Sequence, residues 1–391
     1  MAKHIHHSRR VLLGSTGLVK PAGGLILPPA KRIEGIIPPH MHSEILRRSH
    51  DPVVLELIRK TRALTHRLLN ESPDPVIFSR TVGQALRQIF DAHDQEDLEG
   101  VKVRQEGQAP IGEKDADLAY ELTGIVRDYY NSIHGWNSID GAGMDLFSIV
   151  HYGSKFNNAF WNGAKMVYGR GDQLIFATFL VLNVIGHELT HGVTQFTGAF
   201  DYWGQSGALN EHLSDVFGKI IEAWKDKLIT DSDRFDWVIG RGVFVPGVNG
   251  EGIRNMLHPG TAYNDSMLGK DPQPDHMSRY AVTRADRGGV HRNSGIPNRA
   301  FALFAIAAGG YTFEAPALIW FAARALAAKA TNNSPSFAQF AFYTLEAADQ
   351  LGYAKYKDYL VKAWDVVGIT PSASDVDDKT PARQPDLGDG E

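Results

Sequence analysis

The residues His187, Glu188 and His191 form an H-E-x-x-H pattern that follows an almost wholly apolar run, residues 174–185. If the run and the pattern form one buried helix, the two histidines lie one turn apart on the same face. Two imidazoles so placed can hold one zinc ion, and a catalytic zinc site needs three protein ligands and a water. Glu188 then lies beside the metal, where its carboxylate can take a proton from that water. Because short patterns also arise by chance, the prediction depends on a third ligand elsewhere in the chain.

A second segment, residues 207–217, offers carboxylates for the same metal. Its apolar residues recur at helical spacing from Leu209 to Phe217. Glu211 and Asp215 are four residues apart and therefore share a helix face. Glu211 would complete a His-His-Glu zinc site, and Asp215 would accept the free ring N–H of a ligating histidine. Such pairs of acids more often mark a solvated face, but a buried carboxylate needs a partner, and a cation is one.

These two segments, together with N-N-A-F-W-N-G at residues 157–163, resemble the motifs of the thermolysin family of zinc metalloproteases. The chain is most similar to the protealysin-like branch, and the similarity runs from about residue 91 to about residue 369. The resemblance implies an α+β fold, a two-lobed thermolysin-like zincin with a mixed α/β N-terminal lobe, a central zinc-binding helix and a mostly helical C-terminal lobe. It also implies that His187, His191 and Glu211 bind zinc and that Glu188 is the general base.

The resemblance further assigns residues that hold the substrate and stabilise its developing charge. Asn158 and Ala159 are expected to bind the peptide main chain. Tyr202 and His291 are expected to donate hydrogen bonds to the oxyanion, with Asp286 orienting His291. Donors aimed at such a charge are worth about 2.7–4 kcal/mol each. Without the matching segments around them, Tyr202 and His291 would be read as surface residues.

The implied activity is hydrolysis of internal peptide bonds in protein or peptide substrates, with a bulky apolar residue just after the cleaved bond. Val184 and Ile253 would line the apolar pocket, and Arg254 would bind the substrate carbonyl beyond that bond, although it could instead form a salt bridge at the edge of the core. Two alternatives remain. An aminopeptidase would need a carboxylate for the free N-terminus, which no motif assigns. A catalytically latent or inactive zinc-binding protein of the same fold could act as a binding module, which the presence of Glu188, Tyr202 and His291 disfavours.

The double calcium site of many relatives falls here on positions of which only two are acidic. These positions are Asn183, Glu222, Asp236, Val238 and Arg241. Calcium takes six to eight oxygen ligands, so this set is poor for it. Arg241 beside two carboxylates could replace the metal with an ion pair. We therefore expect the double calcium site to be absent or much weakened.

Composition narrows the remaining classes of protein. The chain has 391 residues, a formal net charge of −5 and 43% hydrophobic residues, which is long enough for a large core or two subdomains. No single-sign charge field points to nucleic acid, and no apolar run reaches the eighteen or so residues of a membrane span. The sequence has no cysteine. Disulfides and a thiolate nucleophile are therefore excluded.

The sequence divides into five segments. These are a flexible N-terminal tail at 1–35, a propeptide-like helical segment at 36–85, an α+β catalytic lobe with the zinc-binding helices at 86–240, a helical C-terminal catalytic lobe at 241–370 and a disordered acidic tail at 371–391.

The N-terminal part of the sequence predicts an inactive precursor and suggests that the protein is exported. The sequence I-I-P-P-H at 36–40 resembles the start of protealysin-like propeptides, which predicts that the segment inhibits the cleft until self-cleavage between Asn70 and about Asp94. A permanent N-terminal subdomain is the alternative. Ser8, Arg9 and Arg10 faintly resemble a twin-arginine signal, which suggests a secreted or exported protein, with a flexible tail on a cytoplasmic protein as the alternative.

Overall fold

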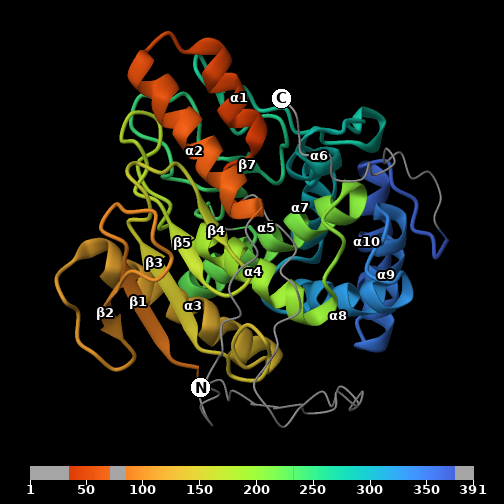
Figure 1. Ribbon diagram of the computed structural model, residues 1–391. Coiled ribbons are helices and arrows are strands. Elements are labelled where there is room, and N and C mark those ends of the chain that lie inside the picture. The colour runs from red at the N-terminus through yellow and green to blue at the C-terminus, as the bar shows by residue number, and fades with distance from the viewer. Residues whose placement is uncertain (1–34, 71–84, 232, 375–391) are drawn as a thin grey trace.

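The computed structural model describes residues 35–70, 85–231 and 233–374 (Figure 1). The helices are α1 Pro39–Arg48, α2 Pro52–Asn70, α3 Lys114–His134, α4 Leu182–Gly198, α5 Gly204–Asp226, α6 Ala285–Asn293, α7 Gly295–Ala308, α8 Ala315–Ala330, α9 Phe337–Gln350 and α10 Lys357–Val366, with 3-10 turns η1 Met277–Arg279 and η2 Ala354–Tyr356. The strands are β1 Arg87–Asp91, β2 Val101–Gln105, β3 Leu146–Val150, β4 Ala159–Trp161, β5 Met166–Tyr168, β6 Val238–Ile239, β7 Arg254–Asn255, β8 Asn264–Asp265 and β9 Gly269–Lys270. Most of the tails predicted at 1–35 and 371–391 lie outside the described residues, since residues 1–34 and 375–391 are not among them.

The N-terminal lobe is built on a mixed sheet with the strand order β2-β1-β3-β5-β4. The strands β1, β3 and β5 are parallel neighbours, while β2 and β4 pair antiparallel at the two edges. The helix α3 packs against this sheet, and it ends where Gly135 adopts a φ of 62°, which glycine adopts without strain. Among the described strands, β4 pairs with β5 alone, so its other edge can accept a further strand.

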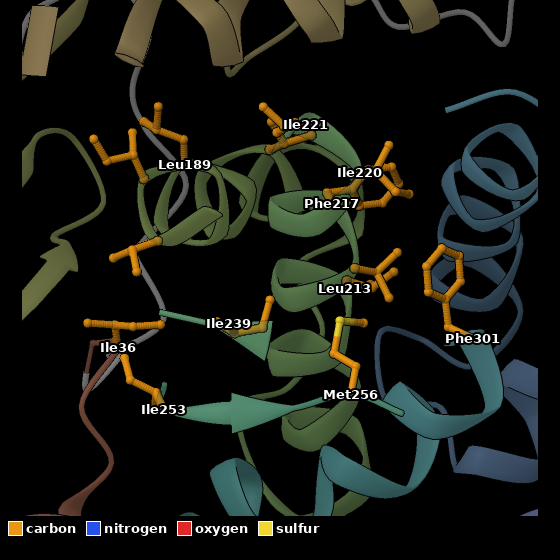
Figure 2. Packing of buried hydrophobic residues seen from close by; sticks show 14 of the residues in the cluster. Ile36, Leu189, Leu213, Phe217, Ile220, Ile221, Ile239, Ile253, Met256 and Phe301 are labelled. Atoms are coloured by element: carbon orange, nitrogen blue, oxygen red, sulfur yellow. The ribbon is translucent and has the colours of Figure 1, made fainter. Parts of the chain in front are cut away.

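The helices α4 and α5 cross the middle of the molecule and pack closely on each other (Figure 1). Glycines set this approach, since a Cβ on Gly186 would lie only 3.0 Å from the Cα of Gly218. Figure 2 shows Leu189 of α4 and Leu213, Phe217, Ile220 and Ile221 of α5 in one buried apolar cluster. The close packing fixes the polar side chains of the two helices relative to one another.

The C-terminal lobe is mostly helical, as predicted, but its first part is not. Residues 241–284 form turns, the short strands β7, β8 and β9 and one 3-10 turn, and the first α-helix of this lobe is α6. This stretch contains glycine and proline at many positions, among them Gly247, Gly250, Pro259 and Pro272, which interrupt helices. The remaining helices, α7 to α10, pack around the buried Trp320 and Trp364.

The two helices before the sheet, α1 and α2, lie side by side and rest on the catalytic lobes (Figure 1). Met41 and Ile45 of α1 and Ile58 of α2 are fully buried. The main-chain N–H of Asn157, just before β4, donates to the Thr61 hydroxyl at 3.2 Å. In the described part of the chain, no helix is long and apolar enough to cross a membrane.

Candidate active site

The side chains of α4 and α5 bring two imidazoles and a carboxylate to one buried point. The Nε2 atoms of His187 and His191 are 3.0 Å apart. Each also lies 3.4 Å from one oxygen of Glu211. All three residues are buried, with at most 1% of their surface exposed.

This arrangement fits a tetrahedral zinc ion. Ligand bonds of about 2.0–2.1 Å at tetrahedral angles place neighbouring ligand atoms about 3.3 Å apart, close to the separations between these three residues. The Oε2 atom of Glu211 is buried and has no hydrogen-bond partner. An orphaned buried carboxylate oxygen facing two imidazole nitrogens is costly without a cation, so the residues present fit the metal.

Partners on the far ring nitrogens orient both histidines. The Nδ1–H of His187 donates to Asp215 Oδ1 at 2.8 Å. The Nδ1 of His191 lies 2.8 Å from the side-chain oxygen of Asn210 and 3.0 Å from the Ser214 hydroxyl. These contacts place the protons on Nδ1 and leave each Nε2 lone pair facing the metal position.

Asp215 is the centre of a buried polar network. Arg254 donates to both of its oxygens at 2.8 Å, and the Asn298 amide donates to Oδ2 at 2.8 Å. Burial alone would raise the pKa of Asp215, but Arg254 and His187 hold it well below its usual range. Burial would likewise lower the pKa of His187, yet Asp215 and Glu211 raise it to about 9.

Glu188 faces the same point from the β4 side. Its Oε2 accepts the Trp161 main-chain N–H at 3.0 Å, while its Oε1 is buried with no partner. Burial raises the pKa of Glu188 to about 7, with a further contribution from the nearby Glu211 charge. A carboxylate with one oxygen fixed and one free, and with a pKa near neutrality, is suited to exchanging a proton.

Tyr202 and His291 approach the site from the other side. The Tyr202 hydroxyl donates to Glu211 Oε1 and lies 3.4 Å from His291 Nε2. Asp286 accepts both the His291 Nδ1–H at 2.6 Å and its main-chain N–H at 3.0 Å. The imidazole is thereby oriented with Nε2 towards the metal position.

The first described residues of the chain lie along the free edge of β4. The Ile36 N–H donates to the Ala159 carbonyl at 3.0 Å, and the Ile37 N–H donates to the Asn158 side-chain oxygen at 3.0 Å. Arg254 donates to the Ile36 carbonyl at 3.4 Å. Figure 2 shows the Ile36 side chain beside Ile253, and Ile36 is fully buried.

The ammonium of Lys219 is a buried cation near the start of α4, among the residues aligned with the calcium site. The Lys219 ammonium lies 2.5 Å from Glu222, 2.6 Å from Asp236 and 3.3 Å from the Val238 carbonyl. Asn183 donates to Glu222 from the other side at 3.2 Å. Arg241 contacts Asp236 at 2.7 Å and Glu251 at 3.4 Å, and half of its side chain is exposed.

The structure thus brings the sequence-predicted residues into one site. His187, His191, Glu211, Glu188, Tyr202 and His291 surround one point, and Asp215, Asp286, Arg254, Asn158 and Ala159 contact them or the strand beside them. The sequence reasoning gave no role to Asn210 and Ser214, although both lie in the segment 207–217 that it singled out. It missed Asn298, because an amide far along the chain carries no motif. It also missed Lys219, although the spacing of three residues to Glu222 could have suggested this pair.

Comparisons with known proteins agree with this geometry. The family described as "Thermolysin metallopeptidase, catalytic domain" matches residues 85–195, and "Thermolysin metallopeptidase, alpha-helical domain" matches residues 198–369. An "Extracellular metalloprotease" of Pectobacterium carotovorum subsp. carotovorum is 40% identical over 345 residues, 87% of this chain and 97% of that protein. A "Thermolysin" of Alicyclobacillus acidocaldarius subsp. acidocaldarius is 43% identical over 183 residues, 46% of this chain and 31% of that protein.

A solved structure is similar over nearly the same span. The "Precursor of Protealysin, Metalloproteinase from Serratia proteamaculans" is 41% identical, with a TM-score of 0.79 over 86% of this chain and 99% of that one. The family matches cover most of the chain, and they include the helices that carry His187, His191 and Glu211. The protein therefore belongs to the thermolysin family of zinc metallopeptidases.

Proposed function

We propose that the protein cleaves internal peptide bonds before bulky apolar residues, with Glu188 as the general base. The observation that carries this proposal is the convergence of three potential zinc ligands with the free oxygen of a buried glutamate that is not itself a ligand. A purely structural zinc site would be closed by a fourth protein ligand. At this point the described residues offer three ligands, which are His187, His191 and Glu211. One position therefore remains for water or substrate.

When bound by these three residues, zinc acidifies a coordinated water to a pKa of about 7 and polarises a carbonyl group. Glu188 accepts the proton of the attacking water at its free Oε1. The same carboxylate then carries the proton to the leaving amine nitrogen. The Trp161 N–H holds the other oxygen of Glu188 in place during both transfers.

Two donors stabilise the negative charge that develops on the carbonyl oxygen. The Tyr202 hydroxyl can turn from Glu211 towards this oxygen, and His291 presents Nε2 beside it. Asp286 anchors the His291 ring through Nδ1. We assign each donor about 2.7–4 kcal/mol of transition-state stabilisation, the usual value for a positioned donor.

The free edge of β4 and its neighbouring pocket would hold the substrate. The Ala159 carbonyl and the Asn158 amide already accept hydrogen bonds from a peptide segment of this chain, and Arg254 donates to that segment. Ile36 buries its side chain beside Ile253 (Figure 2), so a bulky apolar side chain fits there. This occupancy supports the apolar preference expected from the sequence.

The same contacts support latency of the full chain. Residues 35–37 take up the substrate edge, and α1 and α2 bury apolar residues against the catalytic lobes. We propose that the protein is a zymogen whose N-terminal segment is removed by self-cleavage between Asn70 and about Asp94. Export is part of the proposal, because the relative from Pectobacterium carotovorum subsp. carotovorum, of which this chain covers 97%, is named "Extracellular metalloprotease".

We also propose that the region of the double calcium site holds no calcium. Lys219 places a positive charge between Glu222 and Asp236, with 5% of the lysine surface exposed. A fixed ammonium there repels a divalent ion and uses the oxygens that the ion would need.

The test is cleavage of casein and of a peptide library by the full-length protein, with and without a zinc chelator, alongside Glu188→Ala. Chain length is followed by mass spectrometry in the same samples. Chelator-sensitive cleavage before apolar residues, with N-terminal shortening lost in Glu188→Ala, is expected. A zinc-loaded protein that keeps its full length and cleaves nothing would instead favour an inactive binding protein of the same fold.

A further inference from the structure

A line of buried hydrogen bonds runs from the core of the helical lobe to the zinc ligand His187. The Trp320 indole N–H of α8 donates to His212 Nε2 at 2.8 Å. The His212 Nδ1 lies 2.8 Å from the Asn298 side-chain oxygen, and the Asn298 amide donates to Asp215 Oδ2 at 2.8 Å. Asp215 accepts the His187 Nδ1–H through its other oxygen.

The groups at the two ends of this line fix the direction of every bond in it, because the ionised Asp215 carboxylate can only accept. An indole N–H can only donate, so the Trp320 contact makes His212 Nε2 an acceptor. The ring proton of neutral His212 is then on Nδ1 and points at Asn298, whose oxygen must accept it. The Asn298 amide group is therefore turned so that its NH₂ faces Asp215.

We propose that Trp320, His212 and Asn298 form a positioning relay that holds Asp215, and through it His187, in the geometry that binds zinc. The residues of the relay do not touch the substrate or the metal position. This proposal rests on the zinc site of the proposed function, and it adds three positioning residues from α8, α5 and α7. All three are fully buried, so water cannot replace a lost member cheaply.

The relay makes a prediction that simple packing does not. If the Trp320 N–H is removed, His212 Nε2 loses the donor that makes it an acceptor, and the ring can move its proton to Nε2. The Asn298 oxygen would then face an acceptor on His212, so this hydrogen bond is lost and the Asn298 amide can flip. A flipped amide presents an oxygen to the Asp215 carboxylate, so Asp215 loses a donor and its hold on His187 weakens.

The experiment compares Trp320→Phe with Trp364→Phe in the full-length protein. Trp364 is a matched control, because it is fully buried, stacks 6.2 Å from Trp320 and donates its N–H to Thr344 at 3.1 Å, outside the relay. The readouts are zinc affinity by competition with a chelator and the visible absorption spectrum of the cobalt-substituted protein. Thermal unfolding of both variants measures the loss of packing.

We expect Trp320→Phe to weaken zinc binding about 10-fold, at the low end of the 10–100-fold typical for partners of metal ligands. It should also change the cobalt spectrum, while Trp364→Phe changes neither. Equal zinc affinity in the two variants would overturn the relay. A wild-type protein that takes up no zinc would instead refute the proposed function.

A measurement on the wild-type protein tests the relay without any substitution. The ¹⁵N chemical shifts of His212 report which ring nitrogen carries the proton, in both the metal-free and the zinc-loaded protein. A neutral ring protonated on Nδ1 is expected. A ring protonated on Nε2 would overturn the relay even if the variants failed to fold.

Discussion

The substitution Gly35→Ala should release the block at the substrate edge. Gly35 has a φ of 86°, and a Cβ there would lie 2.4 Å from the Ala159 carbonyl oxygen and 2.9 Å from the Asn158 side-chain oxygen. Contacts this short cannot be kept, and the Ala159 carbonyl belongs to a strand that has little room to move. The alanine therefore disfavours the docked segment and leaves the catalytic lobes untouched.

Two contributions determine how much docking free energy Gly35→Ala removes. Placing a non-glycine residue in the left-handed region costs about 1–2 kcal/mol. Forcing an extra methyl group into a packed contact costs about 1–3 kcal/mol more. Both costs apply only to the docked state, so docking weakens by at least about 2 kcal/mol. At about 1.4 kcal/mol per tenfold change, the open fraction rises at least about 30-fold.

The assay measures hydrolysis of a short fluorogenic peptide by the full-length protein before any shortening is visible by mass spectrometry. Activity is expressed as a fraction of that reached after shortening is complete. Gly352→Ala is the control, because Gly352 has a φ of 76° and no atom within 4 Å of its added Cβ. Gly352→Ala therefore has the cost of a left-handed backbone at alanine but no short contact with β4.

The reasoning would be refuted if Gly35→Ala remained as latent as the wild type. It would also be refuted if Gly352→Ala released activity to the same extent, because the effect would then reflect general destabilisation.

Three further predictions concern other parts of the structure. Lys219→Met should lower the free energy of unfolding by about 2 kcal/mol in urea titrations, because it leaves the partly buried carboxylates of Glu222 and Asp236 without their cation. Millimolar calcium should not raise the thermal stability of the wild type. Tyr202→Phe should lower kcat about 10²–10³-fold with little change in KM, which steady-state kinetics can check. Burial would lower the pKa of His151, but its hydrogen bonds to Asp115 and Asp91 raise it. The contribution of His151 to stability should therefore be complete below about pH 6.5 and fall as the pH rises, so unfolding of His151→Gln and wild type should differ most at low pH.

Much of the site could be predicted because its ligands lie in two short segments. The spacing of His187 and His191 and that of Glu211 and Asp215 each place a pair on one helix face, and the structure has both helices. The two N-terminal helices, the helix before residue 134 and the last four helices also follow their apolar periodicity. These features are local, so the sequence contains what determines them.

The remaining features depend on contacts between distant parts of the chain. Asn298 meets Asp215 across 83 residues, and His212 meets Trp320 across 108. Neither pair has a spacing or composition that distinguishes it from ordinary core residues. The stretch at 241–284 was predicted to belong to a helical lobe, but its glycines and prolines favour turns and short strands.

Residues 35–37 block the substrate edge while they are joined to the catalytic lobes, and this covalent link affects how activity depends on protein concentration. While the chain is intact, residues 35–37 meet β4 as an intramolecular ligand, whose effective concentration is in the millimolar range for a short tether and does not change on dilution. Once the chain is cut after Asn70, the same contacts become an equilibrium between two molecules. A concentrated sample of cut protein would then stay inhibited by its own released segment, and dilution alone would make it active.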